Sequence, residues 1–321
     1  MDKKCLYCYK PLDGQIKGDF HEHCSLEFFG TKQQPAFLHS MQEMVELAKN
    51  VVERSVAVPG VQPKLSLSLV KDAVDKDAMG RLTVVGALGG NYIFKPPSEN
   101  FAEMPANEHV TMRMAEAFGI RTVKSSLIRL QSGELSYITR RIDRTEEGGK
   151  IHMLDMFQIT EAFDKYKSSM EKIGKALDDY SDAPLLDKLY FLELAIFSFL
   201  TGNNDMHLKN FSMIDKEGSW SLSPAYDLLN VAIVNPEDKE ELALTLEGRK
   251  NKLKREHFER LGKKLGLNEK QLRNLFKRMI ANKPVAMDWI AASFLSDNFK
   301  QKYTGLLEER YNSLFAEDYN P

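Results

Sequence analysis

The spacing of apolar residues changes from a strand period to a helical period near Asp143, and this change most constrains the fold. Before it, alternating apolar residues predict strands at 65–69, 82–88, 92–95, 122–130 and 135–142, with one helix at 105–118. The glycine turn at 89–91 favours a hairpin between the second and third strands. After it, helical spacing predicts helices at 154–163, 168–177 and 184–201 and three or four more between 256 and 315, around a strand pair at 211–214 and 220–222. This order indicates a bilobal α+β chain, with any ligand cleft between the halves.

Charge and apolar runs limit the partners and the compartment that we expect. The 321 residues carry a formal net charge of −2, whereas nucleic-acid binding normally needs a basic face, so no direct nucleic-acid partner is expected. The longest apolar run, 189–200, contains Glu193 and is too short to cross a bilayer. The first residues are polar rather than the apolar run of a secretory signal. We therefore expect a cytoplasmic protein with no membrane association.

The three cysteines of the chain all lie within its first 24 residues. Two close pairs of metal-ligand residues are present there, Cys5 with Cys8 and His21 with Cys24. An odd cysteine count argues against a disulfide framework, whereas this spacing suits a tetrahedral zinc site, with His23 as an alternative ligand. The alternative without a metal is three reduced cysteines beside a surface histidine pair. Because residues 1–35 hold too few apolar side chains for their own core, we predict a zinc-binding segment that serves stability or partner docking.

The segment 201–210 places an acid, a histidine, a lysine and an amide in one loop after an apolar helix. Phosphoryl transfer needs a carboxylate to accept the hydroxyl proton, and an amide and a second carboxylate to hold Mg²⁺. Asp205 and Asn210 have the spacing of a kinase catalytic loop, and Asp227 follows the next strand pair. Each residue alone is compatible with an ordinary turn. As an ordered set they predict Asp205 as the catalytic base and Asn210 and Asp227 as Mg²⁺ ligands.

Earlier segments supply candidates for contacts with a nucleotide. Lys95 ends an apolar strand, and Glu108 lies on the next helix. In kinases, a strand lysine that is paired with a helix glutamate contacts the phosphates of the nucleotide. Taken singly, each is also compatible with an exposed charge. Residues 58–64 offer backbone N–H groups to phosphates, with an ordinary turn as the alternative. The connector 139–144 offers backbone groups to adenine and the carboxylate of Asp143 to a ribose hydroxyl, with a charged strand end as the alternative.

The chain resembles the HipA family of bacterial serine/threonine kinases over about residues 50–300. Four blocks carry the resemblance, in family order: Gly60-Val-Gln-Pro-Lys64, Tyr92-Ile-Phe-Lys95, Arg140-Arg-Ile-Asp-Arg144, and Asp205-Met-His-Leu-Lys-Asn210 with Tyr226-Asp227. The resemblance implies a bilobal, protein-kinase-like fold, with a β-rich N-lobe at 36–142 and an α-helical C-lobe at 143–321. Full-length HipA has a small N-terminal subdomain where this chain has the segment 1–35, so the chain is more similar to the short HipT form.

The resemblance also implies which residues bind ATP. These are Pro59, Gly60, Val61, Gln62, Pro63 and Lys64 in the phosphate loop, Lys95, Arg140, Arg141, Ile142 and Asp143, and His207, Leu208, Lys209, Asn210, Tyr226 and Asp227. Pro63 departs from the pattern, because some members carry an acidic residue there. Many members phosphorylate a serine in or before the phosphate loop, for which Ser55 is the candidate here, although the gap to Gly60 is longer than the family pattern.

Substrates and partners follow from the resemblance alone. Family members phosphorylate aminoacyl-tRNA synthetases and are restrained by small antitoxins of the HipB or HipS type. The resemblance thus implies a toxin–antitoxin protein kinase that uses ATP and Mg²⁺. Two alternatives remain open: a small-molecule kinase of related fold, and a catalytically inactive regulatory module. The presence of Lys95, Asp205, Asn210 and Asp227 counts against the inactive module.

Overall fold

The structure, a computed structural model, describes residues 3–14, 18–44, 46–47, 64–70, 80–85, 90–98, 100–145 and 147–316. The chain divides into two compact units. Unit 1 comprises Met1–His109, Val123–Gly149 and Ala292–Phe294, and unit 2 comprises Val110–Thr122, Lys150–Ala291 and Leu295–Pro321. The boundaries predicted at residues 35 and 142 stay predictions.

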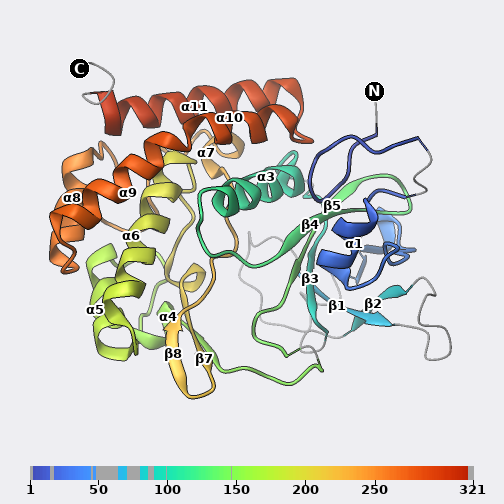
Figure 1. The fold of residues 1–321 in the computed structure, drawn as a ribbon, viewed down its shortest axis with the longest axis horizontal. Coiled ribbons are helices and arrows are strands. Elements are labelled where there is room, and N and C mark those ends of the chain that lie inside the picture. The colour runs from blue at the N-terminus through green and yellow to red at the C-terminus, as the bar shows by residue number, and fades with distance from the viewer. Residues whose placement is uncertain are drawn as a thin grey trace. The chain divides into compact units, whose positions relative to one another are not determined.

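Unit 1 is built on a five-stranded antiparallel sheet in the order β2-β1-β3-β5-β4 (Figure 1). Its strands are β1 (Leu65–Val70), β2 (Arg81–Val85), β3 (Tyr92–Lys95), β4 (Ser125–Arg129) and β5 (Leu135–Arg140). Leu67, Phe94 and Tyr137 lie on three neighbouring strands and are fully buried, as the alternating pattern predicts. The helices of this sequence region include α1 (Glu22–Phe29) and α3 (Met104–Ala117), and α3 continues from unit 1 into unit 2.

The hairpin predicted between the second and third strands is wrong. β1 lies between β2 and β3 and pairs with both, so that Leu67 is opposite Val84 on one side and Tyr92 on the other. Gly90 has a φ of +78°, and a Cβ atom there would lie 2.3 Å from the carbonyl oxygen of Leu67. The glycine therefore allows the backbone to pass close to β1, rather than forming the predicted turn of a hairpin between β2 and β3.

Unit 2 contains a three-stranded antiparallel sheet and most of the helices. The sheet has the order β6-β7-β8, from β6 (Met153–Asp155), β7 (Ser212–Lys216) and β8 (Ser219–Leu222). The helices are α4 (Met156–Ile159), α5 (Met170–Tyr180), α6 (Pro184–Leu200), the 3₁₀ helix η1 (Leu208–Asn210), α7 (Val231–Val234), α8 (Arg255–Lys264), α9 (Glu269–Ala281), α10 (Lys283–Ala292) and α11 (Asp297–Phe315). The predicted helix 154–163 is instead strand β6 followed by the single turn of α4, because Asp155 caps that turn by accepting from the backbone N–H of Gln158.

Helix α6 is the central element of unit 2. Pro184 lies at its N-terminus, where a missing N–H group has no cost, and every residue from Phe191 to Leu200 is buried. Among the described residues, no helix combines the length and apolar character that a bilayer crossing requires. α6 is therefore a core helix, and the loop 201–207 begins at its C-terminal end.

Candidate active site

A glycine turn sets the direction in which the chain leaves α6. Gly202 has a φ of +67°, and a Cβ atom there would lie 2.3 Å from Leu306 and 2.8 Å from the side-chain oxygen of Asn230. The backbone oxygen of Gly202 accepts hydrogen bonds from the N–H groups of Val231 and Ala232, at 3.0 and 3.1 Å. Only glycine fits this conformation and this packing, so the loop that follows is anchored at its first residues.

Asp205 lies in this loop with its carboxylate accessible. Its side chain is 42% exposed, and Oδ1 accepts a hydrogen bond of 2.7 Å from the Tyr166 hydroxyl. Nε2 of His207 lies 4.0 Å from the same oxygen. The backbone oxygen of Asp205 accepts from the His207 N–H at 2.8 Å and from Nδ2 of Asn210 at 2.9 Å. The loop is thus held through its backbone, and the carboxylate remains able to meet a substrate hydroxyl.

Asp227 is joined to the same loop through the residue before it. The Tyr226 hydroxyl donates to the backbone oxygen of Lys209 at 2.9 Å and lies 2.5 Å from Oγ of Ser212. Burial raises the pKa of this hydroxyl well above its usual value. Asp227 itself has a φ of +56°, a left-handed conformation that non-glycine residues seldom adopt and that concentrates at functional sites.

His207 lies within electrostatic range of both Asp205 and Asp227. Its imidazole is buried, and burial lowers its pKa, while the nearby charges of Asp205 and Asp227 act in the opposite direction. Both carboxylates therefore lie within electrostatic range of one buried ring. A carboxylate such as that of Asp227 and an amide such as that of Asn210 are oxygen donors of the kind that Mg²⁺ prefers. The structure places Asp205, His207 and Asn210 in one hydrogen-bonded loop, and Tyr226 joins the neighbouring Asp227 to it, while the roles predicted for these residues stay predictions.

The remaining loop residues have structural contacts. Leu208 is buried in η1, and its N–H donates to the backbone oxygen of Lys165 at 3.1 Å. Nζ of Lys209 lies 4.7 Å from the centre of the Phe157 ring. Burial raises the pKa of Asp155, and its hydrogen bond from Gln158 and the charge of Lys209 oppose that change. Lys209 thus lies near a partly buried carboxylate.

In unit 1, the predicted lysine–glutamate pair is formed. Nζ of Lys95, at the end of β3, lies 2.6 Å from Oε1 of Glu108 on α3, and the two side chains are 4% and 2% exposed. The ammonium group also lies 5.3 Å from the centre of the Tyr137 ring. A buried charge pair of this kind is fixed in position, because separating the two groups would leave two uncompensated charges.

The connector after β5 is held by its own charges. Arg141 donates to both oxygens of Asp143, at 2.9 and 2.6 Å, and Arg144 donates to Oδ2 at 2.6 Å. Burial alone would raise the pKa of Asp143, but the hydrogen bonds and charges of the two arginines lower it below its usual value. Ile142 is half-buried beside them. Nε of Arg140 donates instead to the backbone oxygen of Phe28, at 2.7 Å.

The phosphate loop of the prediction lies almost wholly outside the described residues. Ser55, Pro59, Gly60, Val61, Gln62 and Pro63 all fall there. Lys64 is described and exposed, directly before β1. The roles assigned to these residues stay predictions.

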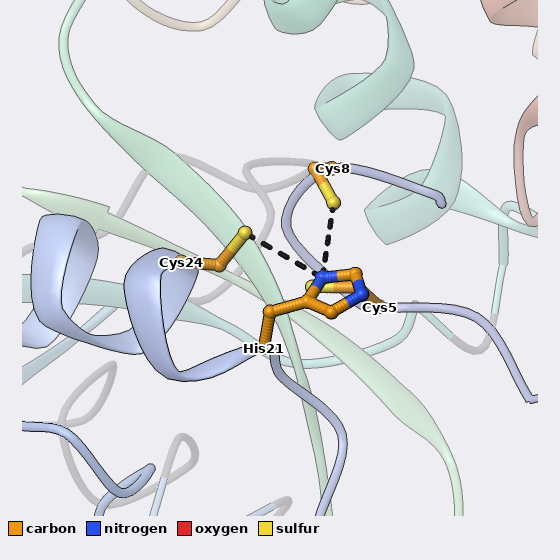
Figure 2. A group of neighbouring side chains, drawn as sticks. All are labelled: Cys5, Cys8, His21 and Cys24. Atoms are coloured by element: carbon orange, nitrogen blue, oxygen red, sulfur yellow. Dashed lines mark hydrogen bonds between the residues drawn. The ribbon is translucent and has the colours of Figure 1, made fainter. Parts of the chain in front are cut away.

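The four residues of the predicted zinc site lie together (Figure 2). The ligand atoms of Cys5, Cys8, His21 and Cys24 are all within 4.8 Å of one another. Nδ1 of His21 is 3.4 Å from the Cys8 sulfur and 3.8 Å from the Cys24 sulfur, while Nε2 lies 3.0 Å from the backbone oxygen of Pro11. An Nε2–H group that donates to this carbonyl leaves the Nδ1 lone pair facing the sulfurs, as in histidines that bind zinc. Within the described residues this is the one group of its kind.

The thiols of this cluster affect one another strongly. A hydrogen bond from Cys8 lowers the pKa of Cys5 to about 4, and burial raises the pKa of Cys24 to about 12. The same hydrogen bond, in which Cys8 is the donor, raises the pKa of the Cys8 thiol. His23, the alternative ligand, stacks on His21 and has Nε2 3.3 Å from the Cys24 sulfur, outside the group of four. The donor set of three sulfurs and one imidazole fits tetrahedral Zn²⁺.

Sequence reasoning missed Tyr166. Its hydroxyl donates to Asp205, and its ring lies 5.0 Å from that of His207 in an edge-on arrangement. Burial, and then the hydrogen bond to Asp205, raise the pKa of this hydroxyl. Tyr166 precedes Asp205 by 39 residues and belongs to a segment without helical or strand spacing, so no local pattern points to it.

Comparison with solved structures defines the class of fold. HipA of Shewanella oneidensis, solved in a complex of that toxin–antitoxin system with HipB and operator DNA, superposes with a TM-score of 0.68 at 20% identity, over 88% of this chain and 72% of that one. The proinflammatory kinase CtkA of Helicobacter pylori gives 0.51 at 13% identity, over 70% of this chain and 88% of that one. The predicted α+β fold of the HipA type is confirmed.

Sequence comparison defines the family. The model of the HipA-like C-terminal domain matches residues 56–287, and the chain belongs to this family. "Putative kinase Y4dM" of Sinorhizobium fredii is 32% identical over 245 residues, which are 71% of this chain and 58% of the relative. "Putative kinase" of Haemophilus influenzae is 28% identical over 212 residues, 62% of this chain and 59% of the relative. The serine/threonine-protein kinase toxin HipA of Shewanella oneidensis is 25% identical over 198 residues, 55% of this chain and 43% of the relative. The chain therefore matches less than three fifths of the length of these curated relatives.

Proposed function

We propose that this protein is an ATP-dependent serine/threonine protein kinase of a toxin–antitoxin system. The observation that carries the proposal is the loop 201–210 of unit 2, where the accessible carboxylate of Asp205 lies 4.0 Å from the buried imidazole of His207. Asn210 is hydrogen-bonded to the Asp205 backbone, and Tyr226 joins Asp227 to the same loop. Phosphoryl transfer depends on positioning and charge stabilisation, and these groups supply a base and oxygen ligands for a metal. Membership of the HipA-like family supports the same reaction.

We propose the following roles in phosphoryl transfer for residues of the chain. Asp205 accepts the proton of the attacking hydroxyl, while Asn210 and Asp227 would hold Mg²⁺, which would neutralise charge on the phosphates. Lys95, kept in place by Glu108, contacts the phosphates. His207 and Lys209 lie beside the transferred group, residues 59–64 cover the phosphates, and the backbone of 140–142 meets adenine. Ser55 is the proposed site of autophosphorylation.

Substrate and partners are proposed from the relatives. A relative is named a serine/threonine-protein kinase toxin, and the HipA structure with a TM-score of 0.68 was solved with its partner HipB. By analogy, we propose that this chain phosphorylates a protein substrate such as an aminoacyl-tRNA synthetase. We also propose that it binds a small antitoxin of the HipB or HipS type. ATP and Mg²⁺ are the cofactors of the reaction, and the Cys/His cluster would hold a structural Zn²⁺.

The test is transfer of label from γ-labelled ATP in a bacterial lysate from which endogenous kinases have been removed. We expect label in a protein band in the presence of Mg²⁺, and none with Asp227→Asn or after chelation of Mg²⁺. Phosphopeptide mapping then identifies the acceptor hydroxyl and shows whether Ser55 is labelled. Label confined to small molecules would contradict the protein-kinase assignment, and an absence of any transfer by the wild-type protein would contradict a kinase of either kind.

A further inference from the structure

The N-terminal segment, defined as residues 3–14 and 18–29, packs on the rest of unit 1 through aromatic side chains. Phe28 and Phe29 are buried and lie 5.8 and 6.2 Å from the ring of Tyr92 in β3. Its only helix, α1, has eight residues, and the rest of the segment consists of turns, irregular backbone and an isolated β-bridge between Lys4 and Pro11. The four metal-ligand groups thus lie in a segment with little regular secondary structure. A bound metal has its greatest effect on the conformation of such a segment.

A tyrosine next to one of these ligands reaches helix α3. Tyr9 follows Cys8 directly, has a φ of +64°, and donates its backbone N–H to the carbonyl oxygen of Cys5 at 3.0 Å. Its hydroxyl lies 2.8 Å from Nδ1 of His109, and the two rings meet edge-on at 5.3 Å. Tyr9 is 3% exposed and His109 is fully buried. The turn between Cys5 and Cys8 thus determines where this hydroxyl contacts α3.

His109 is adjacent to the glutamate that pairs with Lys95. Successive residues of an α-helix point about 100° apart around its axis. Glu108 binds Lys95 at 2.6 Å, while His109 contacts Tyr9 on a neighbouring face. Anchors on two different faces both oppose rotation of the helix about its axis. The contact with Tyr9 therefore stabilises the orientation in which Glu108 meets Lys95.

Two further contacts hold the segment in place. Nζ of Lys4 donates to the backbone oxygens of Ala292 and Ser293, at 2.7 and 3.1 Å. At the other end, the oxygen of Phe28 near the C-terminus of α1 accepts from Arg140 of β5. The segment is thus attached at His109 of α3, at Arg140 of β5 and at residues 292–293, and each of these contacts lies within unit 1.

We infer that Zn²⁺ bound by Cys5, Cys8, His21 and Cys24 makes the N-terminal segment a clamp, which positions α3 and the Lys95–Glu108 pair through Tyr9 and His109. Tyr9 and His109 are positioning residues, since neither has been assigned a contact with a nucleotide. The consequence for ATP affinity rests on the proposed function, whereas the consequence for α3 does not.

The first test concerns the metal. Elemental analysis of the full-length protein, purified without added chelator, should give about one zinc per chain, as a four-ligand site requires. Replacement by Co²⁺ should give the absorption of a tetrahedral site with thiolate ligands. A protein that is folded through Cys24 without a metal, and that binds no added Zn²⁺ or Co²⁺, would overturn the inference.

The second test compares two tyrosines of the segment. Tyr9→Phe removes the hydroxyl that contacts α3 and keeps the ring. Tyr7→Phe is the matched control, because the Tyr7 hydroxyl donates at 2.7 Å to Glu27, within the segment itself. We expect Tyr9→Phe to retain zinc, to speed amide hydrogen exchange in residues 104–117 roughly two- to tenfold, and to raise the Kd for MgATP by a similar factor, as loss of one hydrogen bond implies. Tyr7→Phe should change neither.

The two readouts separate this inference from the proposed function. Equal exchange in α3 for Tyr9→Phe, Tyr7→Phe and wild type would refute the clamp, whatever the affinity for ATP. If the wild-type protein binds no ATP, the proposed function fails, and hydrogen exchange in α3 still decides the inference. Faster exchange in α3 after removal of zinc from the wild-type protein would support it independently of any substitution.

Discussion

Two groups of charged residues in this molecule differ in their exposure to solvent. The pair of Lys95 and Glu108 is closed to solvent, with side chains 4% and 2% exposed and in direct contact. The carboxylate of Asp205 is 42% exposed and is oriented by one tyrosine hydroxyl and a well-bonded backbone. A residue that supports a ligand gains from a fixed, buried partner, whereas a base that must meet a substrate hydroxyl has to remain accessible. The comparison predicts that substitution of Asp205 should lower activity with little loss of stability, whereas substitution of Glu108 should destabilise the fold.

The largest effect is expected for Asp205→Asn. Loss of the proposed base should reduce phosphoryl transfer by about 10²–10⁴-fold, while the affinity for MgATP and the free energy of unfolding change little. Single-turnover transfer, equilibrium nucleotide binding and denaturant unfolding measure the three quantities. Asp288→Asn is the control, because Asp288 is an exposed aspartate of α10. Substantial transfer by Asp205→Asn would exclude Asp205 as the base.

Glu108→Gln, unlike Asp205→Asn, should destabilise the protein. It removes the negative charge 2.6 Å from the buried ammonium of Lys95, and such a change typically costs about 3–5 kcal/mol of unfolding free energy. Glu116→Gln on the same helix is the matched control: its partner is Arg113, its side chain is 49% exposed, and its loss should cost about 0–1 kcal/mol. Equal stability of the two variants in denaturant unfolding would contradict the proposed difference between buried and accessible groups.

A smaller effect is expected for Tyr166→Phe. The hydroxyl donates to the carboxylate of Asp205, and a hydrogen bond to a charged group contributes about 1.5–3 kcal/mol when buried, less when exposed as here. We expect a roughly three- to tenfold lower kcat with an unchanged KM for ATP. Tyr180→Phe, which alters an exposed tyrosine of α5, should leave both constants unchanged. A changed KM with an unchanged kcat would show that Tyr166 acts on nucleotide binding instead.

The smallest effect concerns the pH dependence of stability. Glu193 of α6 is 1% exposed, and burial raises its pKa to about 7, although the charges of Arg278 and Arg121 oppose this in part. Because the folded protein then holds this proton more tightly than the unfolded chain, the contribution of Glu193 to the free energy of unfolding falls as pH rises from about 4.5 to about 7. Glu193→Gln should flatten this dependence in unfolding experiments at pH 5 and pH 8.

The control for this prediction is Glu269→Gln, at an exposed position in the first turn of α9. Its pH profile should match that of the wild-type protein. An unchanged profile in Glu193→Gln would show that another group is responsible. Glu193 thus refines the comparison, because it is buried like Glu108 while its partner Arg278 is about half exposed, at 47%.

Local patterns in the sequence determined much of this protein. The change of period near Asp143 predicted the α+β class, and helical spacing located α3, α5 and α6 within a few residues. The spacing of the cysteines and His21 predicted a cluster that the structure forms. The order of Lys95, Glu108, Asp205, Asn210 and Asp227 identified the candidate site. Such features are visible in a sequence because helices, knuckles and catalytic loops depend on residues close together in the chain.

Only the tertiary structure decided the contacts between distant segments. β1 enters the sheet between β2 and β3, a choice of strand partner that the alternation of side chains does not specify. Tyr166 meets Asp205 across 39 residues, and Tyr9 meets His109 across 100. A single hydroxyl leaves no periodic signal, and its partner is set by how whole elements pack. For that reason the sequence identified the chemical groups, whereas the fold determined which of them are buried, which are accessible, and which side chains hold them in place.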